Sequence, residues 1–148
     1  METQFELGTD GPSRILVGVD GSNSSLRAAA YAAGLARRQG AKLIVVYVKT
    51  TTQTSIAAPE AVAAMNESRD KIAQELQEQI DANAPRLGLD AELVVRTGNP
   101  YTELMRLSEE RKVDAIVVGA STQAGHRLVG SLATKLVRNA SWPVTVVP

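Results

Sequence analysis

Residues 114–131 read Asp-Ala-Ile-Val-Val-Gly-Ala-Ser-Thr-Gln-Ala-Gly-His-Arg-Leu-Val-Gly-Ser. The apolar run at 115–118 is typical of a buried strand and ends at Gly119, while Gly130-Ser131 has the residue types that begin a helix. A strand, a glycine loop and a helix start in this order turn backbone N–H groups and a helix dipole toward an anion. The stretch therefore predicts an α/β fold. It leaves open whether the loop binds phosphate or only joins strand to helix.

Four further apolar runs, at 15–19, 43–48, 91–95 and 144–147, have the length of strands. The runs at 43–48, 115–118 and 144–147 are almost continuous in β-branched residues, which is typical of parallel strands covered on both faces. The run at 91–95 is more amphipathic and is predicted to lie at a sheet edge.

Helical patterns separate the five predicted strands. They cover residues 24–39, 59–84, 99–111 and 131–140, with Gly or Pro at several of their ends. Alternation of this kind predicts an α/β fold with an open, parallel five-stranded sheet, right-handed crossovers and helices on both faces.

The amino-acid composition argues against several classes of protein. The chain has 148 residues, enough for one domain, and 16 basic residues balance 16 acidic ones. Neutral charge and 3% aromatic residues argue against nucleic-acid binding. Without cysteines, a signal-peptide pattern or a long apolar stretch, we expect a cytoplasmic protein with no membrane association. Residues 1–13 are predicted to be a flexible tail and 14–148 one domain.

Residues suited to a nucleotide follow three of the predicted strands. Asp20 ends the first strand, Val48 the second, and the loop from Gly119 to Ser131 follows the fourth. In open α/β sheets, ligands bind beyond the carboxyl ends of the strands, where the strand order reverses. If the first and fourth strands are neighbours, one cleft collects an aspartate for ribose hydroxyls, apolar groups for a base, and loop amides for phosphates.

Several segments together resemble the universal stress protein family. They are Ile-Leu-Val-Gly-Val-Asp-Gly-Ser at 15–22, Gly98-Asn99-Pro100, Val-Asp-Ala-Ile-Val-Val-Gly at 113–119, Gly130-Ser131, and Trp-Pro-Val-Thr-Val-Val at 142–147. The resemblance implies a Rossmann-like sheet of order 3-2-1-4-5 and a stress-response protein. It also implies a homodimer in which the fifth strand, around Val144 and Val146, pairs across a two-fold axis.

One branch of this family binds ATP through a G-x-x-G-x9-G-[S/T] loop, and another branch lacks both the loop and the ligand. The resemblance assigns Asp20 to the ribose or adenine and Val48 to a backbone contact with adenine. It assigns Gly119, Gly130 and Ser131 to the phosphates, with Mg²⁺ accompanying the nucleotide. The candidate cofactor-binding residues are Asp20, Val48, Gly119, Ala120, Gly125, Gly130, Ser131 and Leu132.

The loop departs from that motif. Thr122 stands at the second glycine position, and Gly130 arrives two residues early, so that Gly125 is the only internal glycine. A shorter loop can still bind phosphate through backbone amides, and AMP or a cyclic nucleotide is an alternative to ATP. A nucleotide-free dimeric regulatory protein with a vestigial loop and a slow ATPase are also compatible with the shorter loop. No Walker Gly-Lys-Ser/Thr supports the ATPase.

Purely structural interpretations stay open for the same residues. Asp20-Gly21-Ser22 fits an Asx turn with a helix cap, and Gly119 and Gly130 fit a strand exit and a helix start. His126 is the only histidine, so neither a metal cluster nor a catalytic acid/base pair is predicted.

Overall fold

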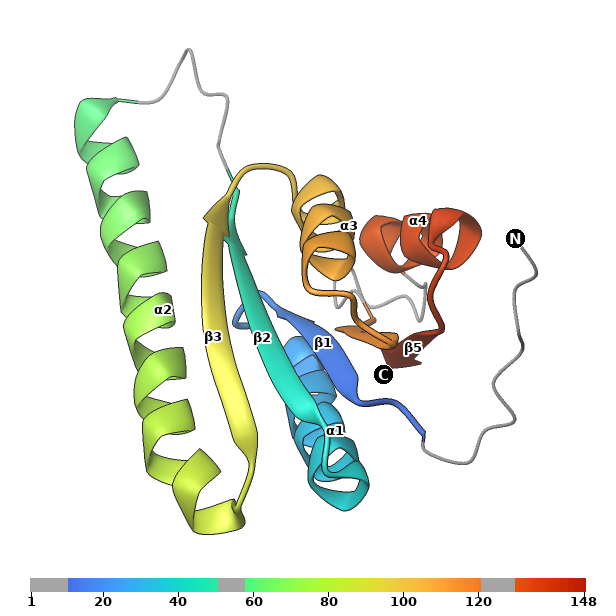
Figure 1. Cartoon of the computed structure of the whole chain (residues 1–148). Helices are drawn as coiled ribbons and strands as arrows, with labels where there is room; N and C mark the ends of the chain where they lie inside the picture. Colours follow the sequence, from blue (N-terminus) through green and yellow to red (C-terminus); the bar gives the residue numbers. More distant parts are fainter. Residues whose placement is uncertain (1–10, 51–57, 121–129) are drawn as a thin grey trace.

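The structure is a computed structural model that describes residues 11–50, 58–120 and 130–148. Strands and helices alternate along the chain (Figure 1), as the sequence predicts. The elements are β1 (Arg14–Val19), α1 (Asn23–Gln39), β2 (Lys42–Lys49), α2 (Pro59–Leu87), β3 (Asp90–Thr97), α3 (Pro100–Glu110), β4 (Ala115–Gly119), α4 (Ser131–Asn139) and β5 (Val144–Val147).

The strands form one five-stranded sheet of order β3-β2-β1-β4-β5. Each neighbouring pair is parallel, and the central strand β1 places Leu16 beside Ile44 of β2 and Ile116 of β4. The predicted strand order is confirmed, and so is the edge position of β3.

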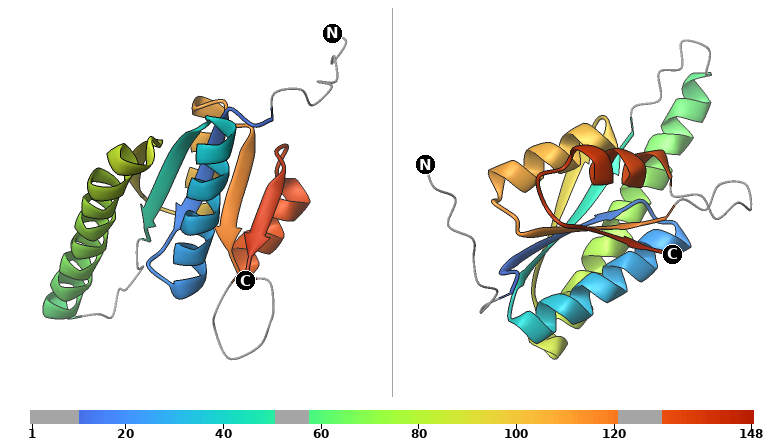
Figure 2. Two further views of the ribbon diagram at one scale, coloured as in Figure 1. Left: turned by 90° about the horizontal axis from the view of Figure 1, so that it is seen from below. Right: turned by 90° about the vertical axis from the view of Figure 1, so that its right-hand side faces the viewer.

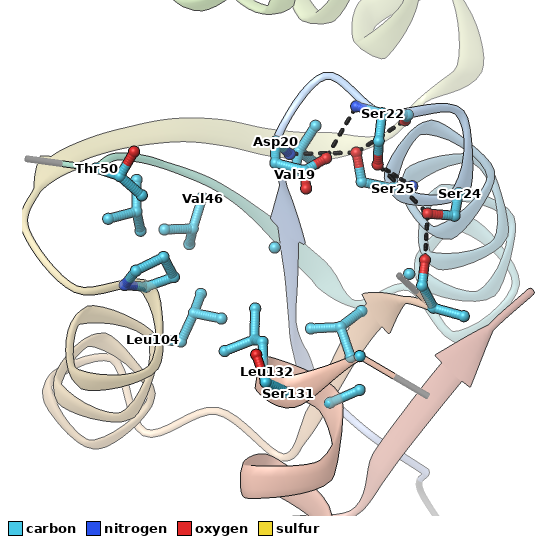
Figure 3. A pocket seen from close by; sticks show the side chains of 18 residues that line it. Val19, Asp20, Ser22, Ser24, Ser25, Val46, Thr50, Leu104, Ser131 and Leu132 are labelled. Carbon is cyan, nitrogen blue, oxygen red and sulfur yellow. Dashed lines mark hydrogen bonds between the residues drawn. The ribbon is translucent and has the colours of Figure 1, made fainter. Parts of the chain in front are cut away.

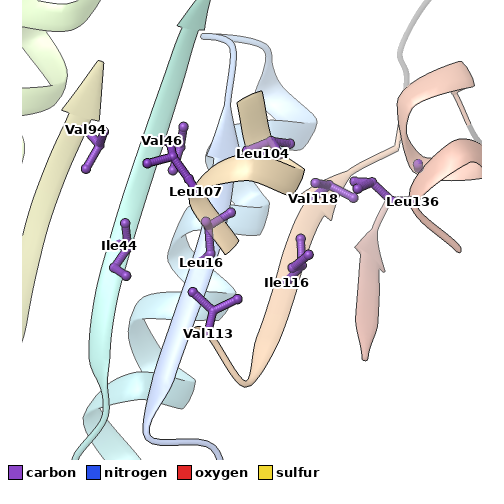
Figure 4. Packing of buried hydrophobic residues seen from close by; sticks show 11 residues of the cluster. Leu16, Ile44, Val46, Val94, Leu104, Leu107, Val113, Ile116, Val118 and Leu136 are labelled. Carbon is purple, nitrogen blue, oxygen red and sulfur yellow. The ribbon is translucent and has the colours of Figure 1, made fainter. Parts of the chain in front are cut away.

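Helices cover both faces of the sheet (Figure 2). On one face, alternate strand residues such as Leu16 pack with Leu104 and Leu107 of α3 and Leu136 of α4 (Figure 4). On the other face, strand residues such as Val17 pack with alanines of α1, and α2 contributes partly buried side chains. Successive strand residues point to opposite faces of the sheet. A strand that is covered by helices on both faces therefore has a nearly continuous run of apolar residues.

Helix α2 extends three residues beyond its predicted end at residue 84. Pro85 lies inside the last turn, and the helix stops at Gly88, whose φ of 64° is left-handed. The Gly88 N–H donates to the carbonyl of Pro85 at 3.2 Å. Glycine takes this conformation without the steric penalty of a side chain, so Gly88 rather than Pro85 ends the helix.

Across residues 11–50, 58–120 and 130–148, no helix has both the length and the apolar character needed to cross a membrane.

Candidate functional site

A cavity of about 450 Å³ opens at the carboxyl ends of β1, β2 and β4 (Figure 3). After β1 the chain enters α1 on one face of the sheet, and α4, which follows β4, lies on the other face. The gap between these two strands is therefore the switch point of the sheet, where ligands of open α/β domains bind. The lining residues are Gly18, Val19, Asp20, Ser22, Ser24, Ser25, Val46, Val48, Thr50, Pro100, Leu104, Val118, Gly119, Ala120, Gly130, Ser131, Leu132 and Ala133.

One wall of the cavity is polar and comes from the turn between β1 and α1. Asp20 Oδ1 accepts a hydrogen bond from the Ser22 N–H at 2.8 Å, and Ser22 caps α1 by accepting from the Ser25 N–H at 3.3 Å. The Ser25 hydroxyl donates to the Ser22 carbonyl at 3.0 Å and accepts from the Asp20 N–H at 3.1 Å. The Asx turn and helix cap are thus present, and they hold Asp20 at the edge of the cavity (Figure 3).

This turn keeps Asp20 ionised. Partial burial raises the pKa of the Asp20 carboxyl, but hydrogen bonds with Ser22 and Ser25 outweigh it and leave the pKa below its ordinary value. A carboxylate at this position is a hydrogen-bond acceptor suited to the hydroxyl groups of a sugar.

The polar wall contacts the end of β4, where the backbone at Gly119 lies close to the backbone of Ser24 and Ser25. The Ser24 hydroxyl donates to the carbonyl of Ala120. A Cβ added at Gly119 would lie 2.6 Å from the carbonyl carbon of Ser24 and 2.7 Å from the nitrogen of Ser25. No side chain fits in that space, so Gly119 has a packing role. Its contact with a phosphate stays a prediction.

The opposite wall is apolar and comes from three other elements. Val46 and Val48 of β2, Leu104 of α3 and Leu132 of α4 line it, and Thr50 lies beyond Val48 along the chain. Val46 and Leu104 also belong to the buried core, so this wall is rigidly backed. An apolar surface of this kind suits the flat face of a heterocyclic base.

The first turn of α4 closes the cavity on the β4 side. Gly130 is the N-cap of this helix and Ser131 its first residue, and no side chain in the described part of the chain caps it. The first N–H groups of a helix have no acceptor within the helix, and they carry the positive end of its dipole. An anion in the cavity can therefore accept hydrogen bonds from these groups and from the Ser131 hydroxyl.

The structure brings the predicted site residues together. Asp20, Val48, Gly119, Ala120, Gly130, Ser131 and Leu132 all line this cavity. Gly125 lies outside the described residues, as do Thr122 and His126. In the described ranges, no group of three or more His, Cys, Asp or Glu side chains could hold a metal ion.

Other lining residues were not predicted from the sequence. Val46 lies two residues before Val48 on the same strand, so the period of two could have identified it. Leu104 lies one helical turn after Pro100, and only the docking of α3 on the sheet brings it to the cavity.

The parallel sheet of order 3-2-1-4-5, with helices on both faces and a cavity at its switch point, places the chain in the class of Rossmann-like α/β domains. Within this class, the model of the universal stress protein family matches residues 12–148. The chain belongs to the universal stress protein family.

Relatives match along almost the whole chain. Universal stress protein YxiE of Bacillus subtilis is 29% identical, and the match covers 91% of this chain and 98% of that protein. A universal stress protein solved in complex with cAMP is 30% identical, with a TM-score of 0.66 and coverage of 93% and 97%. Universal stress protein UspA from Lactobacillus plantarum has a TM-score of 0.73 at 24% identity, with coverage of 92% and 97%, and shows the fold alone.

Proposed function

We propose that this universal stress protein binds an adenine nucleotide in the cavity between β1, β2 and β4. The observation that carries the proposal is the combination of three surfaces in that cavity. A carboxylate, an apolar wall and a helix start that no described side chain caps face one volume of about 450 Å³. Ligand cavities of this size typically hold one small organic molecule.

Each of the three surfaces suits one part of the nucleotide. The base packs against Val46, Val48 and Leu104, because these side chains offer it an apolar face. The ribose hydroxyls donate to the Asp20 carboxylate. The phosphate accepts from the first N–H groups of α4 and from the Ser131 hydroxyl.

Two observations favour AMP or cAMP over ATP. The loop that follows β4 is two residues shorter than the ATP-binding pattern. The relative at 30% identity was solved in complex with cAMP. We therefore propose a nucleoside monophosphate as the ligand. ATP with Mg²⁺ is the second candidate.

Isothermal titration calorimetry of the purified chain with AMP, cAMP, ATP and adenosine tests the proposal. AMP or cAMP should bind more tightly than adenosine, because adenosine leaves the α4 helix start without an anion. Asp20→Asn should weaken binding about tenfold, the effect of losing a hydrogen bond to a charged group. Asp90→Asn, at the start of the edge strand β3, is the matched control and should bind as the natural chain does.

Absence of saturable binding for all four compounds would contradict the proposal and favour a nucleotide-free regulatory protein. Release of phosphate from ATP at a rate that Asp20→Asn lowers would instead favour the slow ATPase. Pairing of two copies through β5, near Val144 and Val146, and a cytoplasmic stress-response role stay predictions.

A further inference from the structure

A second hollow adjoins the proposed nucleotide cavity. Its volume is about 380 Å³, and its lining residues come from the ends of β2 and β3 and from the N-terminal half of α2. Figure 1 shows these two strand ends beside that half of the helix. Thr50 lines both hollows, so the two hollows meet at this side chain. The second hollow is lined by Lys49, Thr50, Val62, Asn66, Arg69, Asp70 and Thr97.

Arg69 occupies an unusual position on α2. The helix turns a stripe of partly buried residues away from solvent, and this stripe includes Met65, Ile72 and Leu76. Arg69 lies between Met65 and Ile72 at the spacing of this stripe, and its own side chain is half-buried. A charged group at such a position requires a polar partner.

Among the described residues, the partners of Arg69 leave most of its hydrogen-bonding capacity unused. Its Nη2 donates to the Thr50 hydroxyl at 3.3 Å, and no carboxylate pairs with Arg69 within the described residues. The neighbouring Lys49 differs, because its Nζ lies 2.6 Å from Asp70 Oδ1. Lys49 and Asp70 therefore neutralise each other, and the hollow keeps the positive charge of Arg69.

We infer that the second hollow is an anion subsite, in which Arg69 recognises an acidic group attached to the base of the bound nucleotide. The inference rests on the proposed function for the placement of the base. We place the base on Val48 with its outer edge toward Thr50, which lies two residues further along the chain and lines both hollows. A substituent on that edge then passes Thr50 and places a carboxylate or phosphate against the guanidinium, which binds two oxygens of either group through paired N–H groups.

The ligand class that follows is an adenine nucleotide with an anionic substituent on its exocyclic nitrogen. Its own phosphate lies at the start of α4 and its second anion lies at Arg69. The two hollows, of about 450 Å³ and about 380 Å³, together remain within the usual range for one organic ligand.

Calorimetric titration with AMP and with N6-(1,2-dicarboxyethyl)-AMP tests this inference. The natural chain should bind the dicarboxyethyl compound about tenfold more tightly than AMP. Arg69→Met keeps an unbranched side chain and removes the charge, so it should abolish this preference and leave the affinity for AMP unchanged. Lys71→Met is the matched control on the exposed side of α2 and should keep the preference. Equal affinities in the natural chain, or a preference retained in Arg69→Met, would overturn the inference.

A second measurement separates failure of this inference from failure of the proposed function. If neither nucleotide binds, the proposed function is wrong, and succinate alone then probes the anion subsite. In NMR titrations, succinate should shift the backbone amides of Asn66 and Thr97 in the natural chain and leave them unmoved in Arg69→Met. The same shifts in both proteins, or no shift in either, would show that Arg69 forms no anion subsite.

Discussion

The two walls of the cavity are built in different ways. The polar wall is local, because Asp20, Ser22 and Ser25 are tied to one another within a single turn of the chain. The apolar wall is assembled from β2, α3 and α4, and its residues Val46 and Leu104 are also part of the main core. One wall is therefore set by hydrogen bonds between near neighbours and the other by packing across the whole domain.

This difference predicts which substitutions should mainly change stability and which should mainly change ligand binding. Truncation of a side chain in the apolar wall removes core packing. It should therefore lower the free energy of unfolding more than it lowers the affinity for a ligand. Replacement of Asp20 by another polar residue leaves the core intact. It should mainly change the affinity for the ligand and the pH dependence of stability. The backbone contact at Gly119, where the polar wall meets β4, lies between these extremes.

The largest effect is expected from Leu104→Ala. Leu104 is 1% exposed, and truncation of a buried leucine leaves a cavity that costs about 2–5 kcal/mol of unfolding free energy. Urea denaturation followed by circular dichroism measures this loss. Leu26→Ala on α1 is the control, because Leu26 is 45% exposed and its truncation should cost less than about 0.5 kcal/mol. Similar losses for both variants would contradict a core role for the apolar wall.

An intermediate effect is expected from Gly119→Ala. The added Cβ meets backbone atoms of Ser24 and Ser25 at 2.6–2.7 Å, so β4 and α1 must move apart at a cost of about 1–3 kcal/mol. Gly34→Ala is the matched control. Gly34 lies inside α1 with nothing within 4 Å of an added Cβ, and alanine there should stabilise the helix by about 0.5–1 kcal/mol. Urea midpoints that move in the same direction for both variants would rule out a clash at Gly119.

The smallest effect concerns Asp20 and acid. Its pKa is below the ordinary value in the folded chain, so the unfolded chain binds more protons and stability falls as the pH falls. The stabilisation is fully present above the ordinary pKa of aspartate, about 3.9, and disappears as the pH falls through the lower folded value. Asp20→Asn should therefore flatten the decline in unfolding free energy between about pH 5 and about pH 3.

Asp114 provides a second carboxylate for comparison at the opposite end of the sheet. Burial raises its pKa, but hydrogen bonds from Ser13 and Arg14 outweigh this and lower the pKa overall. The acid slope that remains in Asp20→Asn should decrease further when Asp114→Asn is added. Urea titrations at each pH measure the slopes. An unchanged slope in Asp20→Asn would show that the turn does not hold the carboxylate in its charged form.

Features that depend on neighbours along the chain could be predicted from the sequence. The alternation of strands and helices, the cap at Ser22 and the helix stop at Gly40 follow from apolar periodicity and backbone preferences. Pro85 shows the limit of such rules, because the last turn of α2 accommodates it and Gly88 ends the helix. The strand order was expected from resemblance to the family, since apolar patterns alone do not say which strands pair.

The sequence by itself determined that a parallel α/β sheet would place Asp20, Val48 and Gly119 at strand ends, because strand ends follow from local residue patterns. Only the tertiary structure decided that Leu104 backs the cavity, that Gly119 packs against the backbone of Ser24, and that Arg69 faces a second hollow. These contacts join residues far apart in the chain. They depend on how each helix docks on the sheet, which no local pattern encodes.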